Sequence, residues 1–215
     1  MTLEHLILLR HGETAWNRAQ RLQGHRDIAL SDAGRNQAVD AAPSVVALRP
    51  EVIVASDLSR ARETADSVAA VMDLPVGVDA RLRETSMGKW EGLTRDEVIA
   101  DWAQEWNDWR TTSAHASPPG GESRWQVAQR AAAVVDELDA GQVSRALLVS
   151  HGGTIVGLTG RLLALPEDSW GTLIGVGNCH WVVLHRYAGA WRLHSYNAGL
   201  GGLVLPRGED QVAGT

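Results

Sequence analysis

Two histidines occupy equivalent positions in the chain, each shortly after an apolar run and directly before a glycine. His11 follows the run 6–9 and Arg10, and His151 follows the run 146–149. Apolar runs of this length predict buried strands, so both imidazoles are expected at strand ends. In an open α/β sheet, ligands bind at this edge, and a following helix directs its free N–H groups toward a bound anion. The pattern favours a phosphate site over a role in packing alone.

Arg60 and Glu84 add the charged groups that phosphate chemistry needs. Arg60 lies in the first turn of a predicted helix at 58–72, where an arginine is unfavourable toward the helix dipole unless an anion lies nearby. A histidine can act as a nucleophile, arginines can hold phosphate oxygens, and a carboxylic acid can protonate a leaving oxygen. The combined set predicts phosphoryl transfer that needs no metal ion: Arg10, His11, Arg60, Glu84 and His151.

The elements that position these residues alternate between strands and helices. Strands are expected at 6–9, 52–56, 75–78 and 145–149, and helices at 13–19, from 33 onward, at 58–72 and at 155–165. The segments 180–187 and 191–197 predict a C-terminal β-hairpin. This alternation predicts an α/β fold, namely a three-layer α/β/α sandwich around a mainly parallel sheet. Pro43 is expected to kink or end the second helix, and Pro166 to stop the last one.

The 215 residues are expected to form a single domain over 1–205, with a small helical insertion at about 94–140 and a flexible tail at 206–215. Trp102, Trp106 and Trp109 are spaced by four and three residues, which places them on one face of a helix in the insertion. Such a stripe more often belongs to a core than to a ligand platform, although it could wall a substrate on one side.

Composition narrows the class of partner. The net charge of -6 without a basic run argues against a nucleic-acid or membrane partner, and no apolar stretch is long enough to span a bilayer. The single cysteine excludes an intrachain disulfide framework. His180, His185 and His194 are unevenly spaced and lack arranged cysteines or carboxylates, so no zinc site is expected. These features make a cytoplasmic enzyme the default expectation. Together with the predicted phosphate site, they favour a small-molecule phosphoester as substrate, with no metal or cofactor expected.

Four blocks of sequence carry a recognisable pattern. They are Leu9-Arg10-His11-Gly12-Glu13-Thr14 with Asn17, Ser56-Asp57-Leu58-Ser59-Arg60-Ala61 with Thr64-Ala65, Leu82-Arg83-Glu84, and Ser150-His151-Gly152-Gly153-Thr154. In this order they resemble the signatures of the histidine phosphatase superfamily, which includes the cofactor-dependent phosphoglycerate mutases. Single short motifs mislead, whereas four ordered motifs rarely do.

The resemblance implies a role for each matching residue. His11 would become phosphorylated on a ring nitrogen, and Glu84 would act as acid toward the leaving group and then as base toward water. The implied phosphoryl-binding and substrate-binding residues are Arg10, Arg60 and His151, assisted by Asn17 and Gln23, with Gly24, Gly152 and Arg124 as further candidates. Because His11 must be unprotonated at the attacking nitrogen, its other nitrogen is expected to donate to a backbone carbonyl.

Hydrolysis is expected rather than isomerisation. Mutases of this family resemble longer chains that hold the substrate carboxylate with a tyrosine shortly after the acid and with a pair of arginines in the insertion. This chain has Met87 in place of the tyrosine, and its insertion offers only Arg95, Arg110 and Arg124, none of them adjacent. A mutase-type isomerase, a broad-specificity acid phosphatase and a phosphate-binding relative with a dead site remain alternatives.

Further blocks resemble the glucosyl-3-phosphoglycerate phosphatase branch of this superfamily. They lie at 21–24, 82–85, 88–94, 119–124 and 177–181. A hydrophilic sugar acid needs convergent hydrogen-bond donors, which Arg124, Gln23 and the tryptophans of the insertion could supply. The hairpin or these tryptophans could also form the surface of a homodimer.

Overall fold

A six-stranded sheet with the order β3-β2-β4-β1-β5-β6 forms the centre of the molecule. The computed structural model describes residues 2–111 and 114–200, and the expected tail at 206–215 lies outside these ranges. The strands are β1 (His5–Arg10), β2 (Val52–Ala55), β3 (Val76–Val78), β4 (Arg145–Ser150), β5 (Trp181–Tyr187) and β6 (Ala190–Ala198). The first four strands pair in parallel, and β5 and β6 are antiparallel to their neighbours. The expected mainly parallel sheet with a C-terminal hairpin is confirmed.

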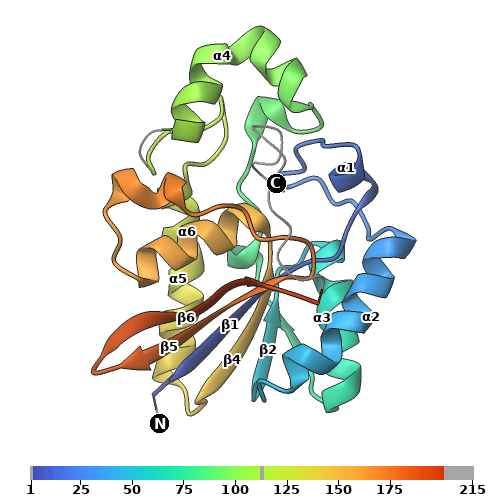
Figure 1. The fold of residues 1–215 in the computed structure, drawn as a ribbon, viewed down its shortest axis with the longest axis vertical. Coiled ribbons are helices and arrows are strands. Elements are labelled where there is room, and N and C mark those ends of the chain that lie inside the picture. Colours follow the sequence, from blue (N-terminus) through green and yellow to red (C-terminus); the bar gives the residue numbers. More distant parts are fainter. Residues whose placement is uncertain (1, 112–113, 201–215) are drawn as a thin grey trace.

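Helices cover both faces of the sheet, as Figure 1 shows. They are α1 (Ala15–Arg18), α2 (Asp32–Val46), α3 (Ser59–Met72), α4 (Arg95–Thr111), α5 (Arg124–Ala140) and α6 (Gly152–Leu162), with 3-10 turns η1 (Ala80–Leu82), η2 (Gly88–Trp90) and η3 (Glu167–Thr172). Side chains alternate between the faces of a strand. Ile7 and Leu9 of β1 therefore pack toward α2 and α3, whereas Leu6 and Leu8 pack toward α5 and α6. The three-layer α/β/α architecture is confirmed.

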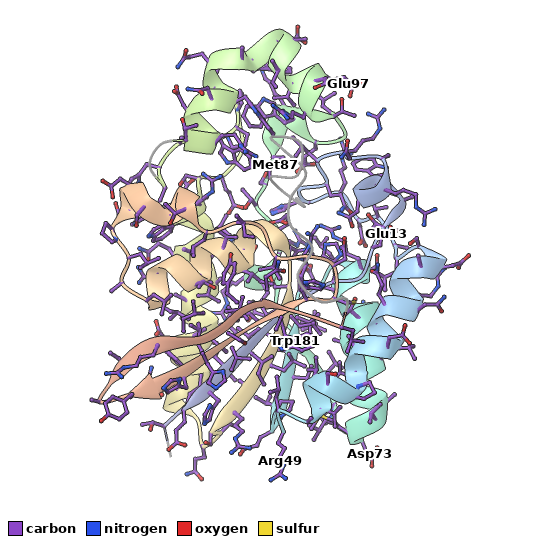
Figure 2. The ribbon with its side chains drawn as sticks, viewed as in Figure 1. Glu13, Arg49, Asp73, Met87, Glu97 and Trp181 are labelled. Carbon is purple, nitrogen blue, oxygen red and sulfur yellow. The ribbon has the colours of Figure 1, made fainter. Side chains whose placement is uncertain are left out.

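The segment around α4 packs through a core of its own, which lies away from the sheet in Figure 1. Its buried members are Leu22, Met87, Trp90, Val98, Trp106 and Trp109. Met87, labelled in Figure 2, lies beneath α4. The single helical face predicted for the three tryptophans is wrong in one respect. Trp102 has non-helical backbone angles (φ -139°, ψ 46°) and kinks α4, so Trp106 and Trp109 are buried while Trp102 is only half-buried.

Two predictions about helix ends are also wrong. Pro43 lies inside α2 without ending it. Proline has no N–H to donate to the carbonyl of Val39, but Pro43 is exposed and Val39 is 62% exposed, so water can reach that carbonyl. The helix expected at 155–165 runs from Gly152 to Leu162. It ends before Pro166, because Ala164 is left-handed (φ 51°) and Leu165 N–H donates to Gly160 O, closing a Schellman turn.

No helix in the described ranges is long and apolar enough to cross a membrane.

The hairpin of β5 and β6 closes through a two-residue turn. Ala188 and Gly189 both have positive φ (50° and 81°), which is the backbone of a two-residue turn that matches the twist of the flanking strands.

Candidate active site

The two histidines meet because β1 and β4 are adjacent and parallel, with Arg10 opposite Ser150 in the register. Each histidine follows the last residue of its strand, so both rings lie at the same edge of the sheet. Their ring centroids are 5.1 Å apart. Both side chains are almost completely buried. The edge predicted for a phosphate site is thus where the structure brings His11 and His151 together.

His11 has one ring nitrogen fixed by the backbone. Its Nδ1 lies 2.7 Å from Gly12 O, and because a carbonyl can only accept, Nδ1 carries the proton and Nε2 keeps its lone pair. Burial, and then the charges of Arg60 and Arg10, lower the pKa of His11 well below its usual value of 6.5. The imidazole is therefore neutral near pH 7, and the expected donation to a backbone carbonyl is confirmed.

His151 has the opposite tautomer. Arg60 Nε donates to His151 Nδ1 at 3.2 Å, so the neutral ring carries its proton on Nε2. Burial and the nearby charges of Arg60 and Arg10 lower the pKa of His151 well below its usual value. Within the described part of the chain, the buried Nε2 has no hydrogen-bond partner. One histidine thus offers a lone pair and the other an N–H donor.

Two arginines place positive charge beside the histidines. Arg10 Nη1 donates to Val176 O at 2.6 Å, and Arg60 donates to Gly24 O and Arg26 O at 2.9 and 2.7 Å. Burial lowers the pKa of each guanidinium to about 10, and the charge of Glu84 opposes this effect. Both arginines therefore remain charged near pH 7.

Buried donors without partners mark what this cluster can bind. Among the residues that the structure describes, Arg10 Nε and Nη2, His151 Nε2 and Gln23 Nε2 are buried and make no hydrogen bond. A buried donor without a partner costs about 1–3 kcal/mol. An oxyanion has acceptor lone pairs on every oxygen, so it would satisfy several of these donors at once.

Glu84 is held at its carboxylate by backbone N–H groups. Oε1 accepts from Thr85 N at 2.8 Å and from Thr154 N at 3.2 Å, and Oε2 accepts from Gly153 N at 3.2 Å. Two of these donors are free N–H groups at the first turn of α6, the helix for which His151 is the N-cap residue. The acid is therefore fixed by the same helix start that follows His151.

The start of α1 and the loop after it are linked by hydrogen bonds, and the loop contacts the cluster through Gly24 O, which accepts from Arg60. Thr14 Oγ1 donates to Gln23 Oε1 at 3.0 Å, and Asn17 Oδ1 accepts from Thr14 N at 3.0 Å in a capping box. Gly24 has φ 51°, and a Cβ there would lie 2.3 Å from Glu91 Oε1. A larger residue would therefore have to take a left-handed backbone and displace the Glu91 side chain, next to the carbonyl that accepts from Arg60.

The remaining two candidates lie in different surroundings. Gly152 is buried at the start of α6, directly after His151. Arg124 begins α5, where its guanidinium stacks over the Trp109 ring at 4.5 Å and donates to Trp109 O. The structure therefore groups Arg124 with the aromatic core beneath α4 rather than with the buried arginine and histidine cluster.

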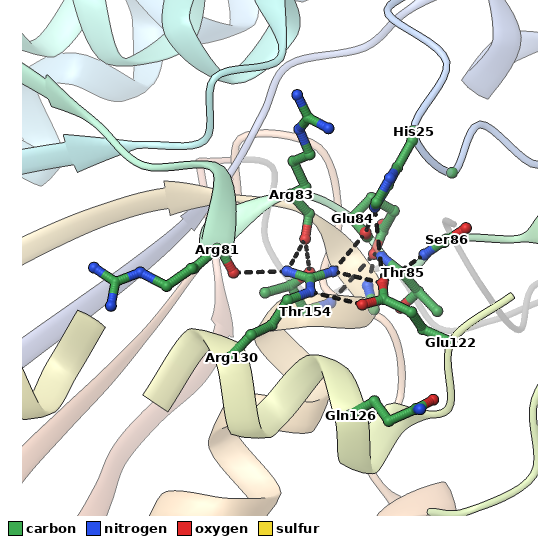
Figure 3. Close-up of polar contacts among 12 residues, drawn as sticks. His25, Arg81, Arg83, Glu84, Thr85, Ser86, Glu122, Gln126, Arg130 and Thr154 are labelled. Atoms are coloured by element: carbon green, nitrogen blue, oxygen red, sulfur yellow. Dashed lines mark hydrogen bonds and ion pairs between the residues drawn. The ribbon is translucent and has the colours of Figure 1, made fainter. Parts of the chain in front are cut away.

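Sequence reasoning gave no role to Thr64, Asn178 or Arg130. Thr64 Oγ1 accepts from Gly12 N at 3.0 Å, and Asn178 Nδ2 donates to His11 O at 3.0 Å. Both therefore fix the backbone around His11. Thr64 and Asn178 belong to blocks that carry the family resemblance, whereas Arg130 lies in no such block, and its contacts in Figure 3 come only from tertiary structure.

An α/β sandwich that collects two histidines, two buried arginines and a carboxylate at one edge of its sheet contains the groups that phosphoryl transfer through histidine needs. A model of the histidine phosphatase superfamily (branch 1) matches residues 6–199. The chain therefore belongs to this superfamily.

Individual relatives refine this assignment. A glucosyl-3-phosphoglycerate phosphatase of Mycolicibacterium vanbaalenii is 42% identical over 217 residues, which cover 92% of this chain and 96% of that protein. The solved structure of a mycobacterial glucosyl-3-phosphoglycerate phosphatase with VO3 has a TM-score of 0.87 and 42% identity, covering 91% of this chain and all 100% of that one. The "Probable phosphoglycerate mutase GpmB" of Erwinia tasmaniensis is 38% identical over 169 residues, covering 76% of this chain and 77% of that protein. The chain is a phosphatase of a phosphorylated metabolite, and catalysis through phosphohistidine is general to its superfamily.

Proposed function

We propose that this chain hydrolyses the phosphomonoester of a sugar acid through a phosphohistidine at His11, without a metal ion, and that glucosyl-3-phosphoglycerate is its substrate. One observation carries the reaction. His11 presents the lone pair of Nε2 inside a buried cluster, and the donors of this cluster that have no partner among the described residues are suited to an oxyanion.

The first half-reaction transfers the phosphoryl group to the protein. The Nε2 lone pair attacks phosphorus, the bond from phosphorus to the ester oxygen breaks, and its electron pair leaves with that oxygen. Glu84 donates its proton to the leaving oxygen, so the product departs as a neutral alcohol. Arg10, Arg60 and His151 Nε2 hold the three non-bridging oxygens as charge shifts among them.

The second half-reaction restores the free site. Water attacks phosphorus while the Glu84 carboxylate takes one of its protons, and the bond from phosphorus to Nε2 breaks with the electron pair returning to the ring. Inorganic phosphate leaves, and Glu84 is protonated again for the next cycle. One ester and one water are consumed for each alcohol and phosphate released.

The proposed absence of a metal requirement has an electrostatic basis. Transfer of a phosphoryl group needs positive charge around its oxygens. Arg10 and Arg60 supply two buried guanidinium charges, and a guanidinium can hold two oxygens at once. Turnover should therefore continue in the presence of a strong chelator.

The proposed substrate has a feature in the structure besides the names of the relatives. Burial, and then the charge of Arg110, lower the pKa of Arg124 to about 10. Both arginines stack on tryptophans of α4. The positive charge of these two arginines suits a substrate that carries a carboxylate, and the sugar part of the proposal rests on the names of the relatives.

The test is phosphate release from a panel of esters with chelator present. The panel contains glucosyl-3-phosphoglycerate, 3-phosphoglycerate, phosphoserine, sugar phosphates and nucleotides. A preference of about a hundredfold in kcat/KM for the first ester would support the proposal, since this corresponds to about 2.7 kcal/mol of discrimination. Equal slow rates on all esters would instead identify a broad-specificity acid phosphatase.

The variant His11→Ala tests the nucleophile. Turnover should be lost, together with the acid-labile, alkali-stable phosphoryl group that the wild-type chain acquires from labelled substrate. Retention of most turnover would refute the proposed chemistry.

A mutase is the second candidate, and the relatives named as phosphoglycerate mutases favour it. It predicts interconversion of phosphoglycerates that depends on a bisphosphate primer. Net phosphate release without a primer, and no isomer formed with one, would exclude it.

We also propose that residues 1–205 form a single domain with the insertion at about 94–140, and that the protein is cytoplasmic. We propose further that it is a homodimer, which sedimentation can test.

A further inference from the structure

The segment that carries Glu84 is held by side chains. Residues 83–87 belong to no helix or strand, so their backbone groups need partners from elsewhere. Leu82 O accepts from Ser150 Oγ, and Arg83 O accepts from Thr154 Oγ1, both at 2.7 Å. His25 Nε2 lies 2.9 Å from Glu84 O. The position of Glu84 thus depends on a frame of polar side chains around its main chain.

Arg130 makes the largest contribution to this frame, as Figure 3 shows. Its Nη1 donates to Arg81 O at 2.6 Å and to Arg83 O at 2.8 Å, and its Nη2 donates to Glu84 O at 2.8 Å. The guanidinium therefore spans the main chain from residue 81 to residue 84. Lysine could not do the same, because its ammonium is a single point on a flexible stem.

Glu122 fixes the orientation of this guanidinium. Arg130 Nε donates to Glu122 Oε1 at 2.9 Å, and Nη2 donates to Oε2 at 2.8 Å. All five N–H donors of the arginine are then used. Burial alone would raise the pKa of Glu122, but the hydrogen bonds from Arg130 and from Ser86 N outweigh this and hold it below the usual value. Glu122 therefore stays ionised near neutral pH.

The two ends of Glu84 are restrained by different groups. Its carboxylate is held by the N–H groups of Thr85, Gly153 and Thr154, and its carbonyl by Arg130 and His25. An acid must lie within about 3 Å of the atom that it protonates. A misplacement of about 1 Å can cost on the order of a hundredfold in rate.

We propose that Arg130, oriented by Glu122, is a positioning residue for the proton transfer by Glu84, with no contact of its own to the phosphoryl group. The inference rests on the proposed role of Glu84 as acid. It predicts that losing Arg130 harms cleavage only where the leaving oxygen needs a proton.

The experiment compares two esters on the same variants. β-Glycerophosphate has an alkoxide leaving group that must be protonated, whereas p-nitrophenyl phosphate releases a stabilised phenolate. The quantity measured is kcat/KM, because it reports formation of the phosphohistidine only. The variants are Arg130→Met, Arg130→Lys and Glu122→Gln, with Glu84→Gln as the reference for loss of the acid.

The chain offers a matched control in Arg186. Arg186 and Asp139 form an ion pair with a closest distance of 2.7 Å, and their side chains are 22% and 28% exposed. The corresponding distance for Arg130 and Glu122 is 2.8 Å, and their side chains are 20% and 24% exposed. Arg186 lies on β5, and within the described ranges its partners are Asp139, Trp191 and Glu4, none of them a proposed catalytic residue. Arg186→Met therefore removes a comparable pair without touching the frame of Glu84.

For Arg130→Met we expect about a hundredfold loss on β-glycerophosphate and less than about threefold on p-nitrophenyl phosphate. Glu122→Gln should give the same selectivity with a smaller loss, Arg130→Lys should recover part of the rate, and Arg186→Met should leave both esters unaffected. Equal losses on both esters, or no loss on either, would overturn the inference. If Arg130→Met fails to fold, Arg130→Lys and Glu122→Gln decide by the same comparison.

Failure of the proposed function gives a different result. In that case Glu84→Gln itself loses both esters equally, or the wild-type chain cleaves neither of them. Selective loss in Glu84→Gln without selective loss in the Arg130 and Glu122 variants refutes only the positioning role.

Discussion

The stability of the free protein should fall as the pH is lowered through the ordinary pKa of histidine, because His11 and His151 are buried as neutral rings. Both have a pKa well below 6.5 in the folded chain, through burial and the charges of Arg10 and Arg60. In the unfolded chain they titrate near 6.5. Between these two values the unfolded state binds more protons, so the free energy of unfolding rises with pH.

The magnitude follows from this linkage. At one pH unit below 6.5, a histidine that stays neutral when folded and titrates freely when unfolded costs about 1.4 kcal/mol. Two such rings therefore cost about 3 kcal/mol between about pH 7.5 and about pH 5.5. This is a large part of the total stability of an average domain, which is about 5–15 kcal/mol.

The window separates the histidines from the carboxylates. Asp57, Glu122 and Asp139 also have a lowered pKa in the folded chain. Their contribution is present above the unfolded pKa of about 4 and is lost only as the pH falls below it. Titration of these groups therefore adds little above about pH 5.

The assay is urea unfolding at several pH values in buffers without phosphate. The wild-type chain is compared with His11→Gln, His151→Gln and the double variant, and with His194→Gln as an exposed control. Each buried-site substitution should remove about half of the excess slope between about pH 7.5 and about pH 5.5, and the double variant should remove most of it. Equal slopes in the wild-type chain and the double variant would refute the assignment of two neutral buried rings.

Three further outcomes follow from burial and close contacts. Trp90→Ala should cost about 3–5 kcal/mol in urea unfolding, because Trp90 is 0% exposed and packs against two other tryptophans; a cost below about 1 kcal/mol would contradict this packing. Cys179 should resist a disulfide reagent until the chain unfolds, since burial raises the pKa of its thiol to about 12, and rapid labelling of the native protein would disprove that burial. Gly24→Ala should weaken the binding of inorganic phosphate about tenfold or more in calorimetry. The new Cβ would lie 2.3 Å from Glu91 Oε1 and would displace the carbonyl that accepts from Arg60. Unchanged affinity would argue that the position of this carbonyl does not affect phosphate binding.

Local sequence predicted the elements well where the physical signal is local. The apolar runs that end at Arg10 and before His151 correspond to buried strands. Ser31 accepts from Gly34 N as the N-cap residue of α2, a position where serine is common. Pro43 was misjudged because the cost of a proline inside a helix depends on which side of the helix faces solvent. Trp102 was misjudged because spacing assumes a straight helix.

The assembly of the candidate site could be predicted only in outline. The carboxyl ends of parallel strands share one edge, so strand-end positions for His11 and His151 were enough to place both rings at that edge. Their 5.1 Å separation depends on the pairing of β1 with β4, two segments far apart in the chain. The tautomer of His11 is fixed locally, by the carbonyl of the next residue, Gly12. The tautomer of His151 depends on a tertiary contact, because Arg60 reaches it from α3.

Arg124 and Arg130 show most clearly which features depend on sequence and which depend on tertiary structure. The sequence by itself determined the fold class and the class of reaction, because apolar runs and residue types are read over a few neighbouring residues. Arg124 was the candidate from the insertion, yet it stacks on Trp109, whereas Arg130 carries no motif and supports the segment of Glu84. Only tertiary structure decided this difference, because a long side chain finds its acceptors through the packing of α5 against a segment remote in the chain.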